Sequence, residues 1–462
     1  MRYTMSYDPV TRIEGHLRIE IETDTVAGVP QVVDARSTGQ LYRGFEKVLI
    51  GRDPRDSQHI TERICGVCPV AHGMAAVMAQ DQALGTEIPL NGLLLRNLVN
   101  AANFVESHIL HFYLLCLPDF IAGPAMPPWQ ADWDIDRRFS KAQSDALLAH
   151  YLQALTIRRQ ADQLTALFGG RAPHPPAYIG GGFTCTPRPE RIAQFRQILA
   201  EVTAFIEATY IPDVQVLAAT YPDYLAVGRG YGNLLAYGAF DHDVQGTESL
   251  FVRGQVRDGS KTVEPLDLDR ITEHVTFSWY QGGSALNPAD VHQPLPENPK
   301  PEAYSWLKAP RYGDLAYEVG PLARMWINGD YRSGISTMDR HLARSQEALK
   351  IAVALRDWVD QLDPDGPVYV QPNLRPSVNG VGLTEAPRGA LGHWLRVGPD
   401  GTISHYQIIS PTTWNCSPRD NSGRLGPLEQ ALLGTPVQDR DRPVEVMRVI
   451  HSFDPCLDCS TH

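Results

Sequence analysis

The sequence predicts an α+β protein that is mainly helical, with a bundle of long helices at its core and small β-sheets at its periphery. Four long segments repeat apolar residues every three or four positions, which is typical of helices with one buried face. Other segments alternate between apolar and polar residues, as strands do. A further region is rich in Gly, Pro and Asp, which predicts a loop-rich insertion.

The N-terminal part, residues 1–60, is predicted to be β-rich. Residues 16–22 (HLRIEIE) alternate in polarity with a period of two, and residues 30–35 are apolar enough to pair with them. The two segments predict a short hairpin or meander. The long helices follow, and the first and last of them are expected to be central in the bundle. They are predicted at residues 90–116, 140–168, 189–210 and 336–361.

Residues 213–312 form the predicted mixed, loop-rich insertion, within which VRGQVRDG (252–259) predicts a hairpin turn. Residues 368–409 alternate between strand-like pieces (VYVQP, HWLRVG, ISHYQII) and Gly/Pro turns. Residues 444–450 predict one last apolar segment. No clear linker separates these parts, so residues 1–462 are expected to form a single interlocked body.

Charge and hydropathy exclude several partners. The chain has 41 basic and 53 acidic residues, a net charge of −12, and no block of five basic residues. Nucleic acid and anionic lipid are therefore not expected as partners. No window supplies the roughly 20 apolar residues that a membrane-spanning helix requires. The first residues, MRYTMSYDPVTRIEGH, show no export signal, so export would depend on another chain.

Four of the seven cysteines form two C-x-x-C pairs near opposite ends of the chain, Cys65 with Cys68 and Cys456 with Cys459. Each pair can bind one soft metal from a single turn, and two pairs supply four sulfur ligands. On spacing alone a structural zinc is as good an explanation as any other. Zinc sites, however, usually keep their cysteine pairs close in sequence.

Other polar residues near the pairs are more than a structural zinc requires. Glu14, Glu46, His72, Arg388 and Asp454 all lie in or near these local contexts. Each alone is commonly a solvated charge or a buried structural group. Their joint occurrence points to chemistry.

The chain resembles the large, catalytic subunit of nickel-iron hydrogenases along its whole length, and the resemblance implies that family's fold. Its most specific part is the pairing of RICGVC with DPCLDC at opposite ends of the chain. The motifs that carry it are DPVTRIEGH, RGFEKVLIGRDP, RICGVCPVAH, SHILHFY, the PHP within 171–175, YSWLKAPRY, YEVGPLAR, EAPRGALGHW, QIISPTTWNCSPRD and DPCLDCSTH.

The resemblance implies that the four thiolates hold nickel and that two of them bridge to an iron carrying CO and two cyanide ligands. Cys65 and Cys456 match the terminal nickel ligands, and Cys68 and Cys459 match the bridging ones. The implied reaction is the reversible heterolytic cleavage of H2, with the proton passing to the sulfur of Cys456. Soft thiolates suit nickel, and a bound thiolate can also act as a base.

Further roles are implied in the same way. Glu14 matches the proton acceptor beside Cys456, and Arg388 and Thr412 match the donors to the two cyanide ligands. His72 matches a hydrogen-bond donor to a bridging sulfur, and Asp454 is expected to face Arg388.

A magnesium ion is also implied near the C-terminus. Its protein ligands would be Glu46, the backbone carbonyl of Ile408 and His462. Oxygen-rich ligation suits magnesium, although a histidine ligand is less usual for it. Two departures from the family pattern concern Ser107, where many members have an aspartate, and the C-terminus. Members are commonly made with a C-terminal extension that is later removed, whereas this chain ends at His462.

Three alternatives remain at this point. The first is a quinone-reducing subunit of respiratory complex I, which shares the ancestry but lacks the four cysteines. The second is a structural zinc protein, which would leave Glu14 and Arg388 without a role. The third is an H2-sensing regulatory subunit, which keeps the same metals. Cys116, Cys185 and Cys416 are isolated, so the chain has no cluster suited to iron-sulfur centres. An iron-sulfur small subunit is therefore expected to cover an apolar face. The chain would fold in the cytoplasm, and any export or membrane association would come through that partner.

Overall fold

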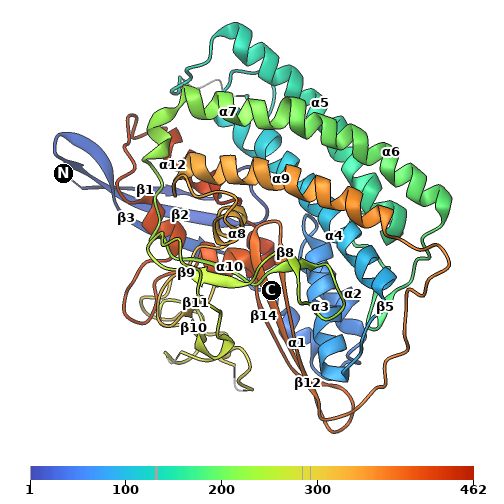
Figure 1. Cartoon of the computed structure of the whole chain (residues 1–462). Coiled ribbons are helices and arrows are strands. Elements are labelled where there is room, and N and C mark those ends of the chain that lie inside the picture. Colours follow the sequence, from blue (N-terminus) through green and yellow to red (C-terminus); the bar gives the residue numbers. More distant parts are fainter. Residues whose placement is uncertain (1, 131–133, 284, 292) are drawn as a thin grey trace.

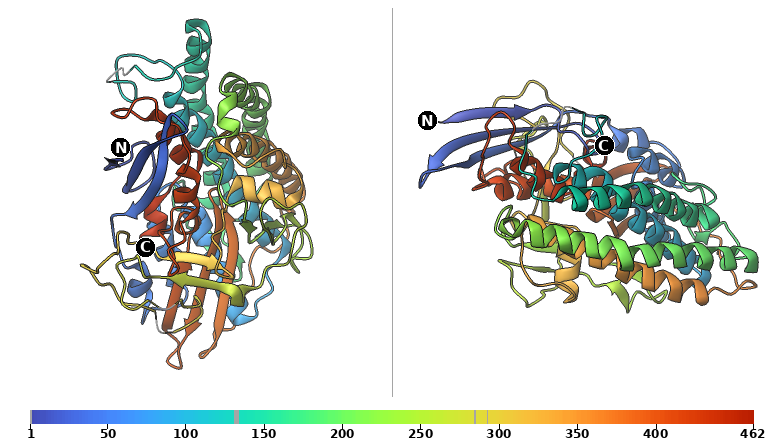
Figure 2. Two further views of the ribbon diagram at one scale, coloured as in Figure 1. Left: turned by 90° about the vertical axis from the view of Figure 1, so that its left-hand side faces the viewer. Right: turned by 90° about the horizontal axis from the view of Figure 1, so that it is seen from above.

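Long helices form a bundle on one side of the molecule, and small sheets lie against its other side (Figures 1 and 2). The computed structural model describes residues 2–130, 134–283, 285–291 and 293–462. This mixed α+β architecture agrees with the predicted fold class. The main helices of the bundle are α4 (Leu90–Leu110), α5 (Lys141–Gly169), α6 (Pro189–Phe205), α7 (Ile211–Thr220) and α9 (Thr337–Asp360).

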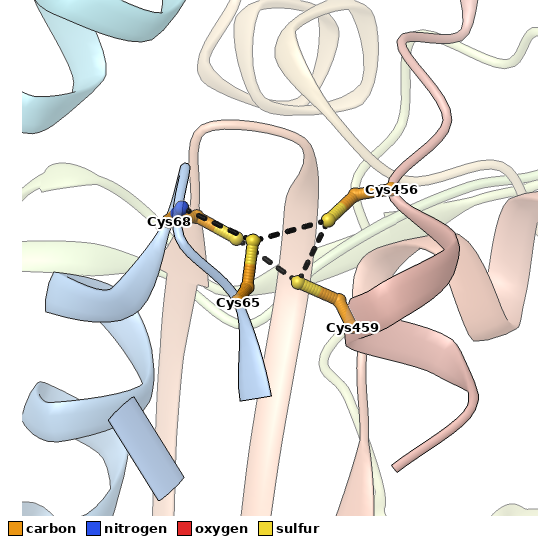
Figure 3. A group of neighbouring side chains, drawn as sticks. All are labelled: Cys65, Cys68, Cys456 and Cys459. Carbon is orange, nitrogen blue, oxygen red and sulfur yellow. Dashed lines mark hydrogen bonds between the residues drawn. The ribbon is translucent and has the colours of Figure 1, made fainter. Parts of the chain in front are cut away.

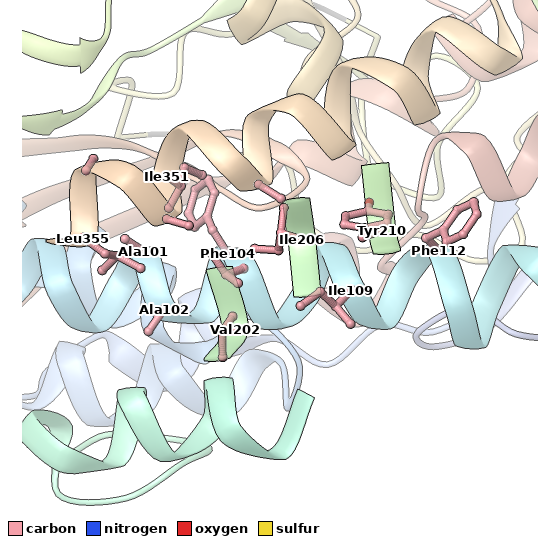
Figure 4. Close-up of a cluster of buried hydrophobic side chains, with 14 of the residues drawn as sticks. Ala101, Ala102, Phe104, Ile109, Phe112, Val202, Ile206, Tyr210, Ile351 and Leu355 are labelled. Carbon is pink, nitrogen blue, oxygen red and sulfur yellow. The ribbon is translucent and has the colours of Figure 1, made fainter. Parts of the chain in front are cut away.

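Helix α4 is the centre of the bundle, since every residue from 91 to 109 is buried. It packs against α5 on one side and α9 on another. Figure 4 shows Ala101, Phe104 and Ile109 of α4 in one cluster with Val202 of α6 and with Ile351 and Leu355 of α9. The expectation that the first and last predicted helices are central is met for α4, and α9 is likewise buried along most of its length.

The predicted helix boundaries follow from local capping. The side chain of Ser140 accepts a hydrogen bond from the backbone of Gln143, and the Ser336 side chain does the same for Asp339, so both serines end the preceding loops. Two predicted helices differ at their C-terminal ends. After α4 and after α6 the chain continues in short π-helical segments, His111–Cys116 and Ile206–Tyr210.

The predicted N-terminal hairpin is present as strands β2 (Leu17–Val26) and β3 (Val29–Gly39), which pair antiparallel. Strand β1 (Tyr3–Tyr7), which the periodicity does not reveal, adds to β2. From Phe45 onward the predicted β-rich part is helical, with α1 (Phe45–Leu49) and α2 (Asp56–Thr61).

A second three-stranded antiparallel sheet consists of β12 (Asn379–Ala386), β13 (Gly389–Val397) and β14 (Ile403–Ile409). Helix α3 (Pro69–Leu84) lies directly on β12. Two glycines of β12 make this close approach possible, because a Cβ atom on Gly380 or Gly382 would come within about 2 Å of a carbonyl oxygen of α3. The strands and the helix together bring the first C-x-x-C pair to one end of this sheet.

The hairpin turn predicted at residues 252–259 is present at the end of that range, where the Ser260 amide donates to the carbonyl of Arg257 at 2.8 Å and Gln255 pairs antiparallel with Glu264. Strand β8 (Ser249–Phe251) pairs with β7 (Ala239–Asp241), and β9 (Gly254–Val256) pairs with β6 (Leu234–Ala236), so the chain runs straight on between β8 and β9. The chain also reverses between β7 and β8, where the carboxylate of Asp243 accepts hydrogen bonds from the next residues of the loop. An aspartate that bonds the backbone just after it is a strong turn former.

Two other predicted segments are resolved by the structure. Of residues 368–372, Val368 and Tyr369 bridge to the hairpin of β4 (Tyr178–Ile179) and β5 (Gly182–Phe183) without forming a strand. Residues 444–450 lie in helix α12 (Val444–Ser452). The remaining elements are β10 (Ile271–His274), β11 (Ala309–Tyr312), α8 (Pro321–Asn328), α10 (Pro411–Asn415), α11 (Pro427–Leu432) and α13 (Leu457–Ser460). Within the described residues, no helix is both long and apolar enough to cross a lipid bilayer.

Candidate metal centre

Four cysteine side chains converge in the interior of the protein, as Figure 3 shows. The Sγ atoms of Cys65 and Cys456 are 3.3 Å apart, and those of Cys68 and Cys459 are 3.0 Å apart. All four Sγ atoms lie within 4.8 Å of one another, and every one of these residues is buried. Four soft donors at this spacing can bind one metal ion or a compact metal group.

Helix ends place the four thiols. Cys68 precedes the first residue of α3, and Cys456 precedes the first residue of α13, which also contains Cys459. Cys456 and Cys459 are three residues apart at the start of α13, so both sulfur atoms project to the same side. Cys65 follows the short 3-10 helix Glu62–Ile64 and approaches Cys68 through the turn before α3. The backbone amides of Val67 and Cys68 donate to the sulfur of Cys65 at 3.2 and 3.4 Å.

The surroundings shift the pKa values of three of these thiols, and not all in the same direction. Burial raises the pKa values of Cys456 and Cys459 well above the usual thiol value. For Cys65 burial is outweighed by hydrogen bonds from the other three thiols and by the charge of Arg388, which hold its pKa well below that value. Four thiolates at this spacing therefore require a bound cation, which would displace the remaining protons.

Arg388 lies in the two-residue turn between β12 and β13 and points toward the thiols. Its Nε donates to the carbonyl oxygen of Asp454 at 3.0 Å, and its Nη2 is 3.0 Å from Oδ1 of the same residue. Both side chains are only 2% exposed. Burial alone would lower the pKa of Arg388, but Asp454 and the thiols raise it well above the usual arginine value. Its Nη1 atom is buried and has no hydrogen-bond partner within the protein.

Glu14 lies beside Cys456 because the two backbone segments pair. The Glu14 amide donates to the carbonyl of Pro455 at 3.3 Å, and the Leu457 amide donates to the carbonyl of Glu14 at 2.7 Å. Gly15 permits this approach, since a Cβ atom there would be 2.7 Å from the backbone nitrogen of Asp458. Burial, the nearby Cys65 thiolate and a hydrogen bond with Asp458 raise the pKa of the Glu14 carboxyl group to about 7.

Thr412 and His72 approach the same site from two further elements. The Thr412 hydroxyl, in α10, accepts from the backbone amide of Cys456 at 3.0 Å, which leaves its own hydrogen free to donate. His72 lies in α3, one turn after Cys68, and its Nδ1 is 3.2 Å from Nε2 of His393. Burial lowers the pKa of His72 to about 3, so the ring is neutral.

A second group of predicted residues meets next to the thiols. Nε2 of His462 is 2.9 Å from the carbonyl oxygen of Ile408 and 3.5 Å from Oε1 of Glu46. Glu46 also accepts from the Ile408 amide at 2.9 Å. Burial alone would raise the pKa of Glu46, but Lys308 and His462 lower it to about 2. Nδ1 of His462 is 2.6 Å from the carbonyl oxygen of Cys459, which joins this group to the thiols.

Arg43 is a site residue that sequence reasoning missed. Its Nη2 donates to the carbonyl oxygen of Ile64 at 2.5 Å and also to that of Asp458. These carbonyls directly precede Cys65 and Cys459, so one guanidinium group links the two cysteine loops. The only sequence signal was its position in RGFE, the motif that was recognised for Glu46.

Ser107, the departure noted in the sequence, lies on α4 with its hydroxyl group buried and without a protein partner. A second group of possible metal ligands, His111, Cys116 and His341, is also buried. Nε2 of His111 is 2.7 Å from the carbonyl oxygen of His451. The rings of His111 and His341 stack with their centroids 5.5 Å apart. This arrangement is that of a packed core rather than of rings aimed at an ion.

Comparison with known proteins connects this geometry to one family. The family model described as nickel-dependent hydrogenase matches residues 43–126, 136–334 and 330–462, and a model described as HoxL-like matches residues 4–36. The chain is 40% identical to the periplasmic [NiFeSe] hydrogenase large subunit of Desulfomicrobium baculatum, over 99% of this chain and 94% of that protein. It is 34% identical to the uptake hydrogenase large subunit of Rhizobium leguminosarum bv. viciae, over 98% and 94% of the two chains.

The solved structure of the Ni-Fe-Se hydrogenase from D. vulgaris Hildenborough, in its as-isolated oxidised state, matches with a TM-score of 0.95. The match has 40% sequence identity and covers 100% of both chains. The names of two of these three proteins include selenium, whereas all four converging thiols of this chain belong to cysteine.

Proposed function

The chain belongs to the nickel-dependent hydrogenase family, whose members are oxidoreductases that act on H2, and from this premise we propose that it reversibly cleaves H2 into protons and electrons. The observation that carries this proposal is the convergence of four buried thiols from two C-x-x-C pairs at opposite ends of the chain. These thiols would hold a nickel ion, and Cys68 and Cys459 would also bind an iron that carries CO and two cyanides. When bound, the nickel-iron group supplies the centre at which H2 is polarised and split heterolytically.

The donors around the thiols suit such a group. Nη1 of Arg388 is a buried N–H donor without a protein partner, and the Thr412 hydroxyl has a hydrogen free to donate. An unpaired buried donor is costly, so a ligand that accepts from Arg388 would stabilise this arrangement. We assign Arg388 and Thr412 to the two cyanides, and the neutral ring of His72 to a bridging sulfur. Asp454 compensates the charge of Arg388.

Two residues of the chain would handle the proton. The sulfur of Cys456 would take it first, because a metal-bound thiolate can act as a base and Glu14 is held beside this cysteine. Glu14 would accept it next, since backbone pairing holds this residue beside Cys456. A carboxyl group with a pKa of about 7 can both accept and release protons near neutral pH.

Electrons would leave through another chain, an iron-sulfur small subunit. Besides the four site cysteines the chain has only Cys116, Cys185 and Cys416, which are isolated in sequence. The side chains of Leu41, Val48 and Ile50, around α1, are exposed and supply apolar surface for such a partner.

Glu46, the Ile408 carbonyl and His462 would bind magnesium. A carboxylate that stays ionised, a carbonyl oxygen and an imidazole converge there. This set is oxygen-rich and leaves room for water ligands, as magnesium prefers. His462 would also hold the C-terminal cysteines in place through its contact with the Cys459 carbonyl.

An infrared spectrum of the purified holoprotein tests the proposal. We expect absorption from metal-bound CO and cyanide, with nickel and iron present in equal amounts and with H2 oxidation by an artificial electron acceptor. Zinc in the thiol site without these bands would overturn it. Full activity of this chain in the absence of any second subunit would contradict the assignment of the electron route alone.

A further inference from the structure

The loop that carries Glu14 connects β1 to β2 and is partly exposed, yet polar contacts hold it at several places. Two of these attachments lie at Glu14 and just before it. Loops of this kind are usually among the more mobile parts of a protein. A proton relay requires its donor and acceptor to remain within hydrogen-bond reach. The contacts that fix this loop therefore bear on whether Glu14 can work.

The first attachment is the backbone pairing of Glu14 with Pro455 and Leu457, at 3.3 and 2.7 Å. It consists of two hydrogen bonds at the position of Glu14 itself. The part of the loop before Glu14 has a separate backbone contact, in which the Val10 amide donates to the carbonyl of Leu17 at 2.8 Å.

The second attachment lies two residues earlier and uses charged side chains. Arg12 forms an ion pair with Asp119 and donates to the carbonyl oxygen of Leu115 at 2.6 Å. Nδ1 of His451 is 2.6 Å from Oδ2 of Asp119, and its Nε2 is 2.9 Å from the carbonyl oxygen of Thr11. Asp119 thus receives Arg12 from the loop on one oxygen and His451 from α12 on the other. We call these three side chains the Asp119 clamp.

The Asp119 clamp is anchored in rigid surroundings. The side chains of Asp119 and His451 are 4% and 1% exposed. The backbone carbonyl of Asp119 accepts from Nη2 of Arg448 at 2.8 Å, and the carbonyl of His451 is 2.7 Å from Nε2 of His111. Asp119 and His451 are therefore part of the core, and they give Arg12 a buried attachment point outside the loop.

His451 makes the clamp relevant to the thiols. It lies in α12, five residues before Cys456, on the same stretch of chain. The contacts of Thr11 with His451 and of Arg12 with Asp119 therefore fix the Glu14 loop relative to the segment that carries Cys456. Arg12 has a φ of 55°, a left-handed conformation that is unfavourable for a non-glycine residue. The clamp holds the loop in this conformation.

We propose that Arg12, Asp119 and His451 are positioning residues that hold the Glu14 carboxyl group at the reach of the Cys456 sulfur. None of them is placed in contact with the metal group or with H2. The inference rests on the proposed function, because it assigns these residues a role that acts through Glu14.

The experiment measures isotope exchange between H2 and D2O by the holoenzyme with its small subunit, which reports proton transfer at the site. Arg12→Gln removes the ion pair on the solvent side and leaves Asp119 bonded to His451. We expect exchange to fall about tenfold, since small displacements of a catalytic group cost one to two orders of magnitude in rate, with nickel and iron content unchanged. The matched control is Arg419→Gln. Arg419 is 26% exposed and pairs with Asp34, as Arg12 is 21% exposed and pairs with Asp119.

A second measurement separates positioning from a general structural effect. In a Glu14→Gln background, Arg12→Gln should change the exchange rate by less than about twofold, because effects that act through one group are not additive. The proposal is overturned if Arg12→Gln exchanges at the wild-type rate, or if it lowers the rate equally in both backgrounds. If Arg12→Gln loses metal, His451→Gln, which keeps an amide donor for Asp119, is measured by the same two criteria.

Failure of the proposed function is recognised separately. A wild-type holoenzyme without CO and cyanide bands and without H2 exchange contradicts the hydrogenase assignment itself. A wild-type enzyme that exchanges, with Arg12→Gln exchanging equally fast, contradicts only the positioning role.

Discussion

Glu14 combines partial exposure with a pKa of about 7, which few carboxyl groups reach without full burial. Burial contributes most, followed by the negative charge of the Cys65 thiolate and the hydrogen bond with Asp458. Its backbone is fixed against the segment that contains Cys456. The residue therefore has both the position and the affinity that a proton carrier between sulfur and solvent requires.

Glu14→Gln should lower H2 oxidation by about 100-fold or more, the usual contribution of a positioned acid or base, while nickel and iron remain bound. The amide keeps the shape of the side chain but cannot carry a proton. Activity assays and metal analysis on the same preparation test this. Cys65→Ser is the contrasting variant, because it removes a ligand and should abolish nickel retention. Loss of metal from Glu14→Gln would show that the residue is structural.

Arg43→Ala should make the thiol site less stable, because two buried carbonyls lose a charged donor, at a cost of about 1–3 kcal/mol. The expected result is faster nickel release to a chelator, with the infrared bands of the remaining holoprotein unchanged. Lys47→Ala, an exposed cation four residues away, is the control. Equal release rates for the two variants would refute the linking role of Arg43.

Residues that belong to a motif could be predicted from the sequence, whereas residues that act through tertiary contacts could not. The thiols, Glu14 and Arg388 are chemically unusual in their local sequence, so the residues alone make them candidates. Arg43 and Asp119 act by bonding residues that lie far away in the sequence. Nothing in their immediate neighbours distinguishes them from surface charges, and only the fold shows their partners.

At the scale of elements, the long helices were predictable from the spacing of their apolar residues, even where nearly every residue is buried as in α4, whereas α3 was not predicted. The segments of α5 and α9 begin at capping serines and carry clear apolar stripes. Helix α3 is buried from Pro69 to Val77 on every side, so it has no polar face to give a period. The turn predicted at 252–259 is present, because Asp258 and Gly259 adopt the positive φ values of a tight turn, whereas the reversal at Asp243 was not predicted.

Helix α11 gives a pH prediction through Glu429, whose carboxylate accepts from the Ser37 amide and the Tyr304 hydroxyl. Burial raises the pKa of this carboxyl group from 4.5 to about 7. Between these pH values the folded protein binds the proton more tightly than the unfolded chain does. The free energy of unfolding should therefore fall as the pH rises through this window.

Glu429→Gln should remove this dependence, so that the variant gains stability relative to wild type between pH 5 and pH 8, by at most about 3 kcal/mol. Thermal unfolding of the two proteins at both pH values measures the difference. Glu190→Gln, an exposed position at the start of α6, should leave the wild-type dependence in place. A parallel response of wild type and Glu429→Gln would contradict the prediction.

At the scale of the whole molecule, the site joins the two ends of the chain. Cys65 meets Cys456, Glu14 pairs with Leu457, and Arg43 bonds Asp458. Terminal segments usually fray unless tertiary contacts hold them. The bound metal group would add the strongest of these contacts, because it engages sulfur atoms of both ends at once.

Protein produced without nickel should therefore show faster amide hydrogen exchange in residues 453–462, by roughly tenfold or more, since a ligand that binds only the closed form stabilises it. Amides of α4, which is buried along its length, serve as the internal reference and should be unchanged. Equal protection of the C-terminal segment with and without metal would show that the protein contacts alone close the site.

The pairing of Cys65 with Cys456 also means that the thiol site cannot be completed until the end of the chain has been synthesised. The two residues are 391 positions apart, and ribosomes add roughly 5–20 residues per second. For about 20–80 s after Cys65 is made, one half of the ligand set waits for the other. During that interval the first thiol pair is reactive and uncovered, so the cell must either shield it or fill it before the last turn of the chain arrives.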